Sequence, residues 1–311
     1  MRVAQSTFAF NFLTQLNQLE QRQNNLQTQA ATGQLFSLPE QNPSAMGQVL
    51  NLQTDVNATT QYQNNITQLQ QTATSTSDAI SGLKAISDRM NEIATLADGT
   101  KSPAQLQAYA TEVGQLIQQA VQLGNSKDQG NYIFGGTATG APPFVATTDS
   151  SGNVTGVAYQ GNTSVAQVEI SPGTTVSTAI PGANTTGTGP RGLFVDSRYG
   201  ADFFGHLISL RNDLQSGNTA AIASTDAPQL SKDEDNLLYH VTANGIIQSR
   251  LQTASTLATQ HNLSSNTELS QKTSADIAQT ITELQQAQTA YSAALQSGSS
   301  ILNLSILNYL H

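Results

Sequence analysis

Residues 125–144, NSKDQGNYIFGGTATGAPPF, interrupt a chain that until then is dominated by Gln, Asn, Thr, Ala and Leu at helical spacing. Gly130 is placed to end the preceding helix in left-handed geometry, and aromatic residues soon after it begin extended structure. Gly135 and Gly136 allow a sharp turn into that structure. We therefore predict a domain hinge at Gly130, Gly135 and Gly136, where a helical region gives way to a β region.

The Gly-rich run at 135–140, GGTATG, also invites a comparison with phosphate-binding loops. Such a loop needs the pattern GxxxxGK[ST] after an apolar strand, and a helix that begins directly behind it. That pattern is absent, and the Ala-Pro-Pro that follows the run cannot open such a helix. The run therefore favours a hinge over a nucleotide site.

Beyond the hinge, short segments rich in Val, Ile, Tyr and Phe are separated by Gly, Pro and Asn up to about residue 188. This alternation is typical of short strands joined by turns. We predict a small β domain over residues 135–198, inserted in the middle of the chain.

Upstream of the hinge, apolar and small residues recur at alternating spacings of three and four, which predicts a helix with a seam along one face. From Pro43 to Asp98 there is no further Pro, so a single helix there would be on the order of 80 Å long. Residues 98–105 break the pattern, and Ser102 is placed to cap a second helix that runs to about Leu123. The seam of the first helix consists of Ile66, Leu69, Ala73, Thr76, Ile80, Leu83, Ser87 and Met90, with Ile86 and Ile93 beside it.

Helical spacing returns at 201–216, at about 226–261 and from about 268 to the end, and the first 30 residues carry a matching stripe. A helix cannot bury a narrow apolar stripe alone, so the terminal helices should pair with each other or with neighbouring copies of the chain. A compact all-α domain is the alternative, but it explains the long, charge-poor helices less well. We predict a self-assembly seam formed by Leu16, Leu19, Leu26, Ile277, Ile281, Leu284, Tyr291, Leu295 and Leu302.

The predicted fold is mainly α with a β insertion. Long terminal helices over 1–42 and 264–311 form a coiled-coil domain. Helices over 43–134 and 199–263 form a rod domain, and 135–198 form the β domain.

The composition excludes several functions. Only 11% of the 311 residues are charged, against roughly a quarter in an ordinary soluble domain. A net charge of -9 with 12 Lys and Arg argues against nucleic acid as a partner. There is no Cys, so disulfides and thiolate metal sites are excluded. No apolar run is long enough to insert into a membrane, and the first residues lack the pattern of a cleaved secretory signal.

No catalytic, cofactor-binding or metal-binding residues are predicted. The acidic run SKDED at 231–235 suits a helix start, where carboxylates meet the positive end of the helix dipole. His206, His240, His261 and His311 share no metal-ligand spacing. The GxSxG pattern of serine hydrolases is absent. We therefore expect that the protein is not an enzyme.

Several of these stretches together resemble the flagellin superfamily and, within it, the hook-associated protein 3 family of hook-filament junction proteins. The stretches are LEQRQNNLQTQAATGQLFSLPEQNPSAMGQVLNLQ (19–53), QYQNNITQLQ (61–70), NSKDQGNYIFGGT (125–137), PPF (142–144), VAYQGN (157–162), TANGIIQSRLQTA (242–254) and ADIAQTITELQQAQTAYSAALQSGSSILNLSILNYL (275–310). They cover most of the chain and keep the family's order.

The resemblance implies a structural protein of the bacterial flagellum. Its terminal segments would form a coiled coil lining the inner tube, its other helices an outer layer, and its β domain would face outward. It would leave the cell unfolded through the flagellar type III exporter, held beforehand by an export chaperone. At the hook-filament junction, copies in a ring would join hook-associated protein 1 to flagellin. A minor flagellin that builds the filament itself is the alternative.

Overall fold

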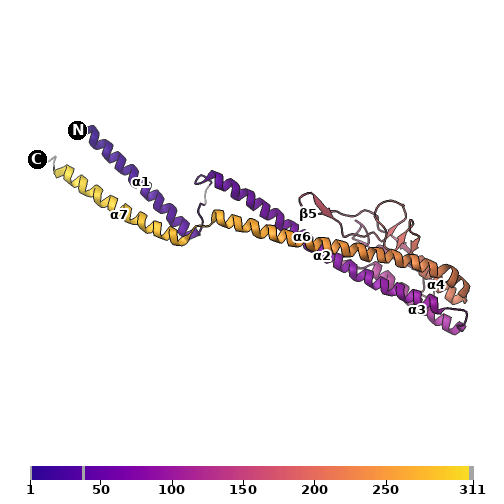
Figure 1. The fold of residues 1–311 in the computed structure, drawn as a ribbon. Helices are drawn as coiled ribbons and strands as arrows, with labels where there is room; N and C mark the ends of the chain where they lie inside the picture. Colours follow the sequence, from indigo (N-terminus) through magenta and orange to yellow (C-terminus); the bar gives the residue numbers. More distant parts are fainter. Residues whose placement is uncertain (1, 37–38, 308–311) are drawn as a thin grey trace. The chain divides into compact units, whose positions relative to one another are not determined.

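The computed structural model describes residues 2–36 and 39–307 of the chain. Two compact units are present, one from residues 1–58 and 261–311 and the other from residues 59–260. Helices α2 (Pro43–Leu96) and α6 (Ala227–Thr273) each contribute residues to both units. The predicted class, mainly α with a β insertion, is confirmed (Figure 1). The division into three domains stays a prediction.

The seam predicted on α2 is buried along its whole length. Every one of its positions from Ile66 to Met90 is less than a tenth exposed, and so are Ile86 and Ile93. The three-four alternation places these side chains on one face of the helix, which is the face that other elements cover. Thr76 and Ser87 are small enough to lie in the same stripe although they carry hydroxyl groups.

Helix α3 (Pro103–Gly124) returns along α2, and its start is fixed by a capping box. The Oγ of Ser102 accepts a hydrogen bond from the Gln105 N–H, and the Gln105 side chain accepts one from the Ser102 N–H at 2.9 Å. Pro103 stands at the first helical position, where a backbone N–H would have no acceptor within the helix. The lack of this N–H in proline therefore costs no hydrogen bond. The predicted cap at Ser102 is therefore confirmed. Across the two helices Arg89 forms a bidentate ion pair with Glu112 at 2.6 and 3.0 Å.

The β segments of the second unit form small separate sheets. Three are antiparallel hairpins, and the fourth is a three-stranded sheet of order β7-β8-β9 in which β7 and β8 are parallel. The strands are β1 (Lys127–Asp128), β2 (Asn131–Tyr132), β3 (Phe144–Thr148), β4 (Val154–Tyr159), β5 (Val168–Ser171), β6 (Thr174–Val176), β7 (Ala183–Asn184), β8 (Val195–Asp196) and β9 (Ala201–Asp202).

Aromatic rings join these strands to the helices. Phe194 lies at the centre, with its ring centroid 4.6 Å from that of Phe144 and 4.9 Å from that of Phe204, onto which it stacks. Phe204 belongs to α4 (Phe203–Ser216), which packs against α3. Gly182 passes so close to Phe144 that no side chain fits between them. The main core of the second unit is thus shared by helices and insert.

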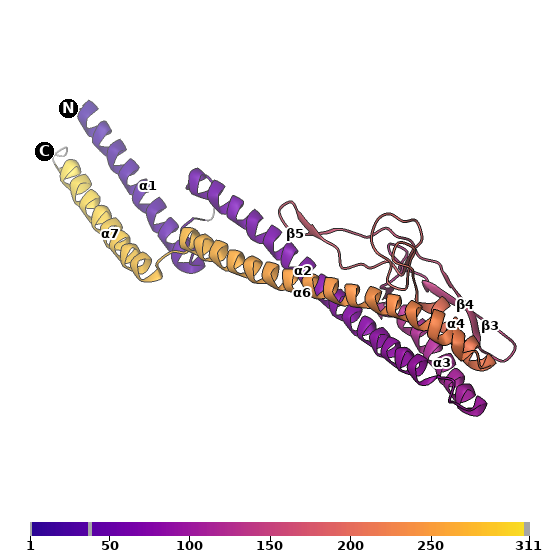
Figure 2. The ribbon, with the colours of Figure 1, turned by 45° about the vertical axis from the view of Figure 1, so that its right-hand side comes forward.

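A smaller core lies under the β5-β6 hairpin. Ile170 and Val176 from the hairpin meet Ile66 and Leu69 of α2, together with Leu251 of α6. All five side chains are buried. The hairpin thereby covers part of the two long helices, beside which it lies in Figures 1 and 2.

Helical structure before and within α6 differs from the sequence expectation. A short helix α5 (Thr219–Ala221) and a π-helical turn (Ile222–Asp226) lead directly into α6. At its other end α6 continues through residues 262–267, where the sequence predicted a break. Asn266 donates to the Asn262 carbonyl one turn earlier, so the side chains of this polar stretch bond within the helix. The break comes instead at 274–276.

The first unit contains α1 (Arg2–Thr32) and α7 (Ile277–Leu307), which lie side by side and antiparallel (Figures 1 and 2). Gly33, with φ of +70°, ends α1 in left-handed geometry. The chain then pairs with the α6–α7 connection, because the Leu35 N–H donates to the Thr273 carbonyl and the Ala275 N–H to the Gly33 carbonyl, each at 2.8 Å.

The approach of Gly182 to the aromatic cluster predicts an effect of adding one methyl group there. A Cβ at Gly182 would lie 2.5 Å from Phe144 Cζ and 2.7 Å from Tyr159 Cε2. We expect Gly182→Ala to lower the free energy of unfolding by about 1–3 kcal/mol through overpacking, measured by urea denaturation. Gly156→Ala is the matched control, since Gly156 has open space at its Cβ position. Equal urea midpoints for the two variants would contradict the expectation.

Candidate functional site

The terminal helices contact each other along one line of small and apolar residues. On α7 the line is buried at Thr280, Ala287 and Gly298 and half-buried at Leu284 and Tyr291. On α1 it includes Leu26, which is buried, and Leu16 and Leu19, which are half-buried. Arg22 and Glu283 approach to 3.5 Å beside it. Of the predicted seam residues, Leu16, Leu19, Leu26, Leu284 and Tyr291 thus lie on or beside the line where the two helices meet.

Gly298 has a steric role in this pair. A Cβ at that position would overlap the ring of Phe12 on α1. The absence of a side chain therefore lets the ring lie against the α7 backbone. Gly298 is not among the predicted seam residues, because a glycine carries no apolar side chain that the spacing could mark.

The remaining described seam residues of α7 are only partly covered. Ile277, Ile281 and Leu295 are 49%, 44% and 46% exposed. They form a second stripe, rotated about 60° around the helix axis from the first, given 100° per residue. On α1, Phe10 and Leu13 are likewise exposed. Leu302 lies within α7, but its side chain is outside those that the structure describes. The sequence left open whether the seam pairs internally or with copies, and about half of each of these three side chains remains exposed in the single chain.

The predicted hinge glycines lie in two different turns. Helix α3 ends at Gly124, six residues before Gly130, so the expectation that Gly130 ends the helix is wrong. The helix ends early because the Asn125 side chain bonds both the N–H and the carbonyl of Phe144, at 2.9 and 2.8 Å. Gly130, with φ of +87°, forms instead the tight turn between β1 and β2, together with Gln129.

Gly135 and Gly136 form a turn that is held by Asn162. A Cβ on Gly136 would overlap the Asn162 carbonyl, and the Asn162 N–H donates to the Gly135 carbonyl at 3.1 Å. The Asn162 Oδ1 accepts from the Thr137 N–H at 3.1 Å. A role for the three glycines as a hinge stays a prediction.

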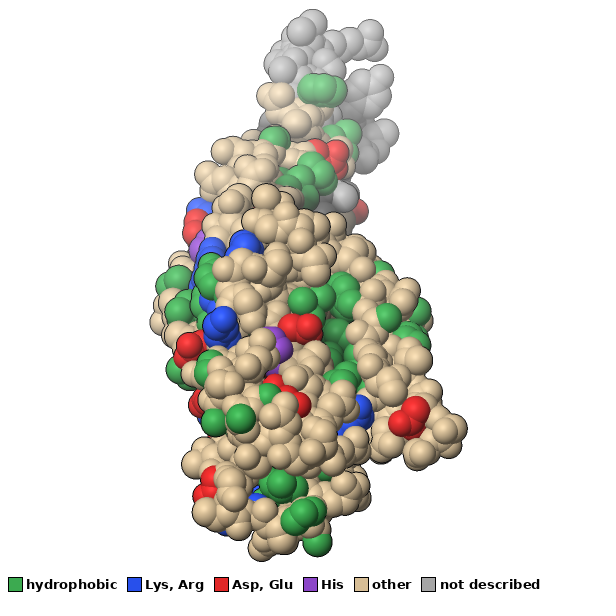
Figure 3. Space-filling model, turned by 90° about the vertical axis from the view of Figure 1, so that its right-hand side faces the viewer, with side chains coloured by type: hydrophobic (Ala, Val, Ile, Leu, Met, Phe, Trp, Pro, Cys, Tyr) green, Lys and Arg blue, Asp and Glu red, His purple; other side chains and the backbone are tan. Residues whose placement is uncertain are grey.

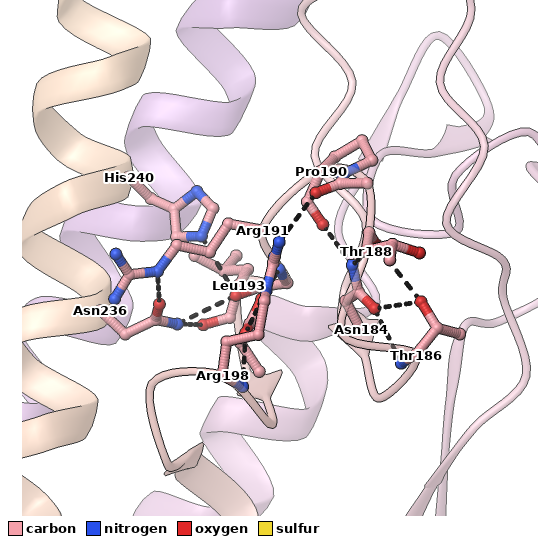
Figure 4. A network of polar contacts seen from close by, with 12 residues as sticks. Asn184, Thr186, Thr188, Pro190, Arg191, Leu193, Arg198, Asn236 and His240 are labelled. Atoms are coloured by element: carbon pink, nitrogen blue, oxygen red, sulfur yellow. Dashed lines mark hydrogen bonds and ion pairs between the residues drawn. The ribbon is translucent and has the colours of Figure 1, made fainter.

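A polar network that the sequence did not predict ties residues 184–198 to α6 (Figure 4). The Asn236 Nδ2 donates to the carbonyls of Gly192 and Leu193, at 3.0 and 2.6 Å, and His240 Nε2 lies 3.1 Å from the Gly192 carbonyl. Within the loop, the Asn184 Nδ2 donates to the Thr188 and Pro190 carbonyls. Buried carbonyls of an irregular loop thereby obtain the donors that a strand partner would otherwise supply.

Asp196 holds the same loop from within. Its carboxylate accepts from Arg198 Nη2 at 2.7 Å and from the Gly192 N–H at 3.0 Å. Burial alone would raise the pKa of Asp196, but the Arg198 and backbone hydrogen bonds lower it below the ordinary range. The side chain is fully buried and charged, and the pairing compensates the loss of water.

The acidic run at 231–235 does not start a helix, because helical structure already begins at Thr219. Its central residue, Asp233, is buried and lies with Oδ2 2.7 Å from His206 Nδ1, while Oδ1 accepts from the Asp202 N–H at 2.9 Å. Burial opposes the charge on His206, but Asp233 raises the pKa of this histidine above its usual value. The pair joins α4 to α6, and it serves packing.

One place in the described part of the chain brings a serine, a histidine and a carboxylate close together. Ser265 and His261 both approach Asp55 Oδ2, at 3.1 and 3.6 Å. The serine hydroxyl therefore donates to a carboxylate. A serine nucleophile would instead donate to the nitrogen of a histidine that acts as general base. Within 2–36 and 39–307 no three His, Asp or Glu side chains are placed to share a metal ion. The described helices contain no stretch apolar enough to cross a bilayer.

The exposed surface carries few charges. On the face in Figure 3, uncharged side chains and backbone predominate, and Lys, Arg, Asp and Glu are scattered. This agrees with the 11% of charged residues in the sequence. Contacts of such a surface depend on apolar packing and on amide and hydroxyl groups more than on charge.

Comparisons with known proteins agree with this architecture. Residues 3–139 match the family model of the bacterial flagellin N-terminal helical region. Among solved structures, a putative flagellar hook-associated protein from Vibrio parahaemolyticus has 20% identity and a TM-score of 0.63, covering 75% of this chain and 100% of its own. Comparison with curated proteins gave no significant match. The resemblance to the flagellin superfamily is thereby confirmed for the N-terminal region.

Two further structures share the fold. Bacillus cereus FlgL has 20% identity and a TM-score of 0.56, with 71% of this chain and 99% of its own covered. The flagellar hook-associated protein 3 of Legionella pneumophila has 15% identity and a TM-score of 0.52, with coverage of 76% and 99%. At such identities the likeness concerns the fold.

The neutral state of His240 predicts a pH dependence of stability. Burial lowers the pKa of His240 to about 4, whereas an unfolded histidine titrates near 6.5. Between these values the unfolded chain binds more protons, so the folded state should lose about 3 kcal/mol as the pH falls from about 6.5 to 4. In His240→Gln the side-chain amide still donates to Gly192 but does not titrate, so this part of the pH dependence should vanish in urea denaturation. The control variant His261→Gln changes an exposed histidine and should retain this part of the pH dependence.

Proposed function

We propose that this chain is a structural adaptor of the bacterial flagellum, which joins the hook, through hook-associated protein 1, to the flagellin filament. The observation that carries the proposal is the agreement of fold with solved flagellar hook-associated proteins over nearly the whole of their length, combined with a terminal helix pair that leaves apolar side chains uncovered. A protein that acts in a larger assembly needs such uncovered surface, because neighbouring subunits then bury it.

The terminal helices are the proposed assembly elements. On this hypothesis copies of the chain form a ring, in which the stripe of Ile277, Ile281 and Leu295 packs on a neighbouring subunit. The first stripe, through Leu284 and Tyr291, holds α7 to α1 within one chain. The β segments would face outward, and Gly130, Gly135 and Gly136 would set the angle at which they leave the helices.

The route to the assembly is also part of the proposal. The chain would pass unfolded through the flagellar type III exporter and act outside the cell, and an export chaperone would cover the apolar stripe of α7 beforehand. Absence of Cys suits this route, because no disulfide has to form or break. The protein would act without catalysis and without a cofactor.

A minor flagellin is the second candidate, since the match at residues 3–139 is to the flagellin N-terminal region itself. The two functions differ in what the purified chain does alone. A flagellin polymerises into long tubes, whereas an adaptor stops after limited association. Electron microscopy of the concentrated protein separates these outcomes.

Deletion of the gene tests the adaptor role directly. We expect cells that carry hooks but no filaments, and flagellin monomers shed into the medium, because filament growth would lack its attachment site. Electron microscopy of the cell surface and immunoblotting of the medium provide the two readouts. Intact filaments after deletion would contradict the adaptor function, and a plasmid copy of the gene should restore them in the deletion strain.

Substitutions in the two stripes of α7 should have different effects. Leu295→Asp changes a half-exposed side chain, so circular dichroism should show an unchanged helix content while motility is lost. Leu284→Asp places a charge against α1 and should weaken the helix pair by about 2 kcal/mol, seen as faster proteolysis of both termini. Gln286→Asp is the control, because Gln286 is exposed on the side of α7 opposite Leu295. Normal swimming of the Leu295→Asp strain would contradict the proposal that the second stripe takes part in the assembly.

A further inference from the structure

Arg191 is held in place by two rings and an amide, and among the described residues no carboxylate pairs with it. Arg191 lies between two tyrosine rings, with its Cζ 3.6 Å from the ring centroid of Tyr199 and 4.4 Å from that of Tyr239. We call these three residues the Arg191 platform. Both rings are about half exposed, at 51% and 48%. The platform therefore faces solvent and not the core.

The orientation of the guanidinium is set from below by a buried amide. Asn236 is 1% exposed, and its Nδ2 is already engaged by the carbonyls of Gly192 and Leu193. Its Oδ1 is consequently free to accept one hydrogen bond, and it accepts that of Arg191 Nε, as Figure 4 shows. The stack and this bond together fix the plane of the guanidinium before any partner arrives.

The outer edge of the guanidinium is unsatisfied. Within the described residues neither Nη1 nor Nη2 of Arg191 has a hydrogen-bond acceptor, and no carboxylate lies within ion-pair distance. Arg22, Arg89 and Arg198 each face a carboxylate of the chain itself, and Arg211 is buried and donates to the Val154 carbonyl. A preorganised fork with two free Nη groups matches the two oxygens of a carboxylate.

Two further basic residues lie near the platform. Arg198 is neutralised by Asp196, and the amine of Lys232 lies beside Gly200, the residue after Tyr199. An arginine fork in such a basic setting suits a carboxylate. Tyrosine and arginine are the residues enriched at the energetic centres of protein-protein interfaces, so a stacked pair of these types favours a protein as the partner.

We propose that the Arg191 platform binds an aspartate or glutamate side chain of a second copy of this chain. The charge balance supports a copy as the partner, because the chain has 21 acidic and 12 basic residues and thus carries carboxylates in excess. The inference rests on the proposed function insofar as that function brings copies of the chain together. It adds a specific contact on the second unit, apart from the terminal stripes.

Photocrosslinking of the full chain tests the contact. A benzoylphenylalanine in place of Tyr199 or Tyr239, expressed in the gene-deletion strain and irradiated on assembled flagella, should yield a product of two chains. Mass spectrometry should place the crosslink beside an Asp or Glu of the second copy. Arg191→Gln in the same chain should lower the yield about tenfold, the effect of losing a charge-assisted hydrogen bond.

Matched variants separate a specific contact from a general loss of fold. Arg250→Gln removes an exposed charge from the same helix α6 and should leave the yield unchanged. Tyr239→Phe, with the crosslinker at Tyr199, keeps the ring and should also retain it. If Arg191→Gln unfolds the loop, by circular dichroism, Arg191→Lys keeps the charge without the planar fork and should still lower the yield.

The outcomes for the platform and for the proposed function are distinct. Crosslinking to a different flagellar protein alone, or no crosslink at all, would overturn the platform even if the unmodified chain restores filaments to the deletion strain. Failure to restore filaments would overturn the adaptor function. Self-crosslinking of the purified, concentrated chain, lost in Arg191→Gln and kept in Arg250→Gln, would still support the platform in that case.

Discussion

A helix with a narrow apolar stripe can remove that stripe from water only against another element, and this constraint governs both units of the chain. In the second unit the stripe of α2 is covered completely, since its residues from Ile66 to Met90 are all buried. In the first unit α1 and α7 cover one stripe of each other, and Ile277, Ile281 and Leu295 remain half-exposed. The same sequence pattern therefore gives a closed core in one unit and an open surface in the other. The difference is the number of elements that surround each helix.

The β segments obey a related constraint, because a two-stranded hairpin has little stability of its own in water. Each is fixed to the helices by a particular device. Phe144 and Phe194 insert their rings into the main core, and Ile170 and Val176 close the smaller one. Where the chain has no regular partner, between Asn184 and Asp196, side-chain amides and a neutral histidine supply hydrogen bonds to its carbonyls. The irregular part of the insert is thus held by polar groups that are buried, and its geometry depends on α6.

Features set by local pattern could be read from the sequence, and features set by distant contacts could not. The buried face of α2 and the cap at Ser102 follow from spacing and from short-range hydrogen bonds, and both are confirmed. Gly130 was misplaced because the helix ends at Gly124, where the side chain of the next residue, Asn125, bonds the backbone of Phe144, 19 positions further along the chain. The role of Asn236 arises from carbonyls more than 40 positions away, at Gly192 and Leu193. The two stripes on α7 lie about 60° apart around the helix axis, and the residues of both recur at spacings of three and four. The spacing alone therefore does not tell which residues belong to which stripe.

Charge and apolar surface contribute differently to the contacts proposed for this chain. Apolar stripes supply strength, but a stripe of similar side chains tolerates sliding along its length, because one leucine replaces another with little loss. A single oriented charge does not tolerate sliding, since a carboxylate must meet the two Nη groups of Arg191 at hydrogen-bond distance. On a surface with so few charged residues, such a point contact encounters little competition from neighbouring ions. The terminal stripes would then determine how firmly copies associate, and the Arg191 platform would determine their register.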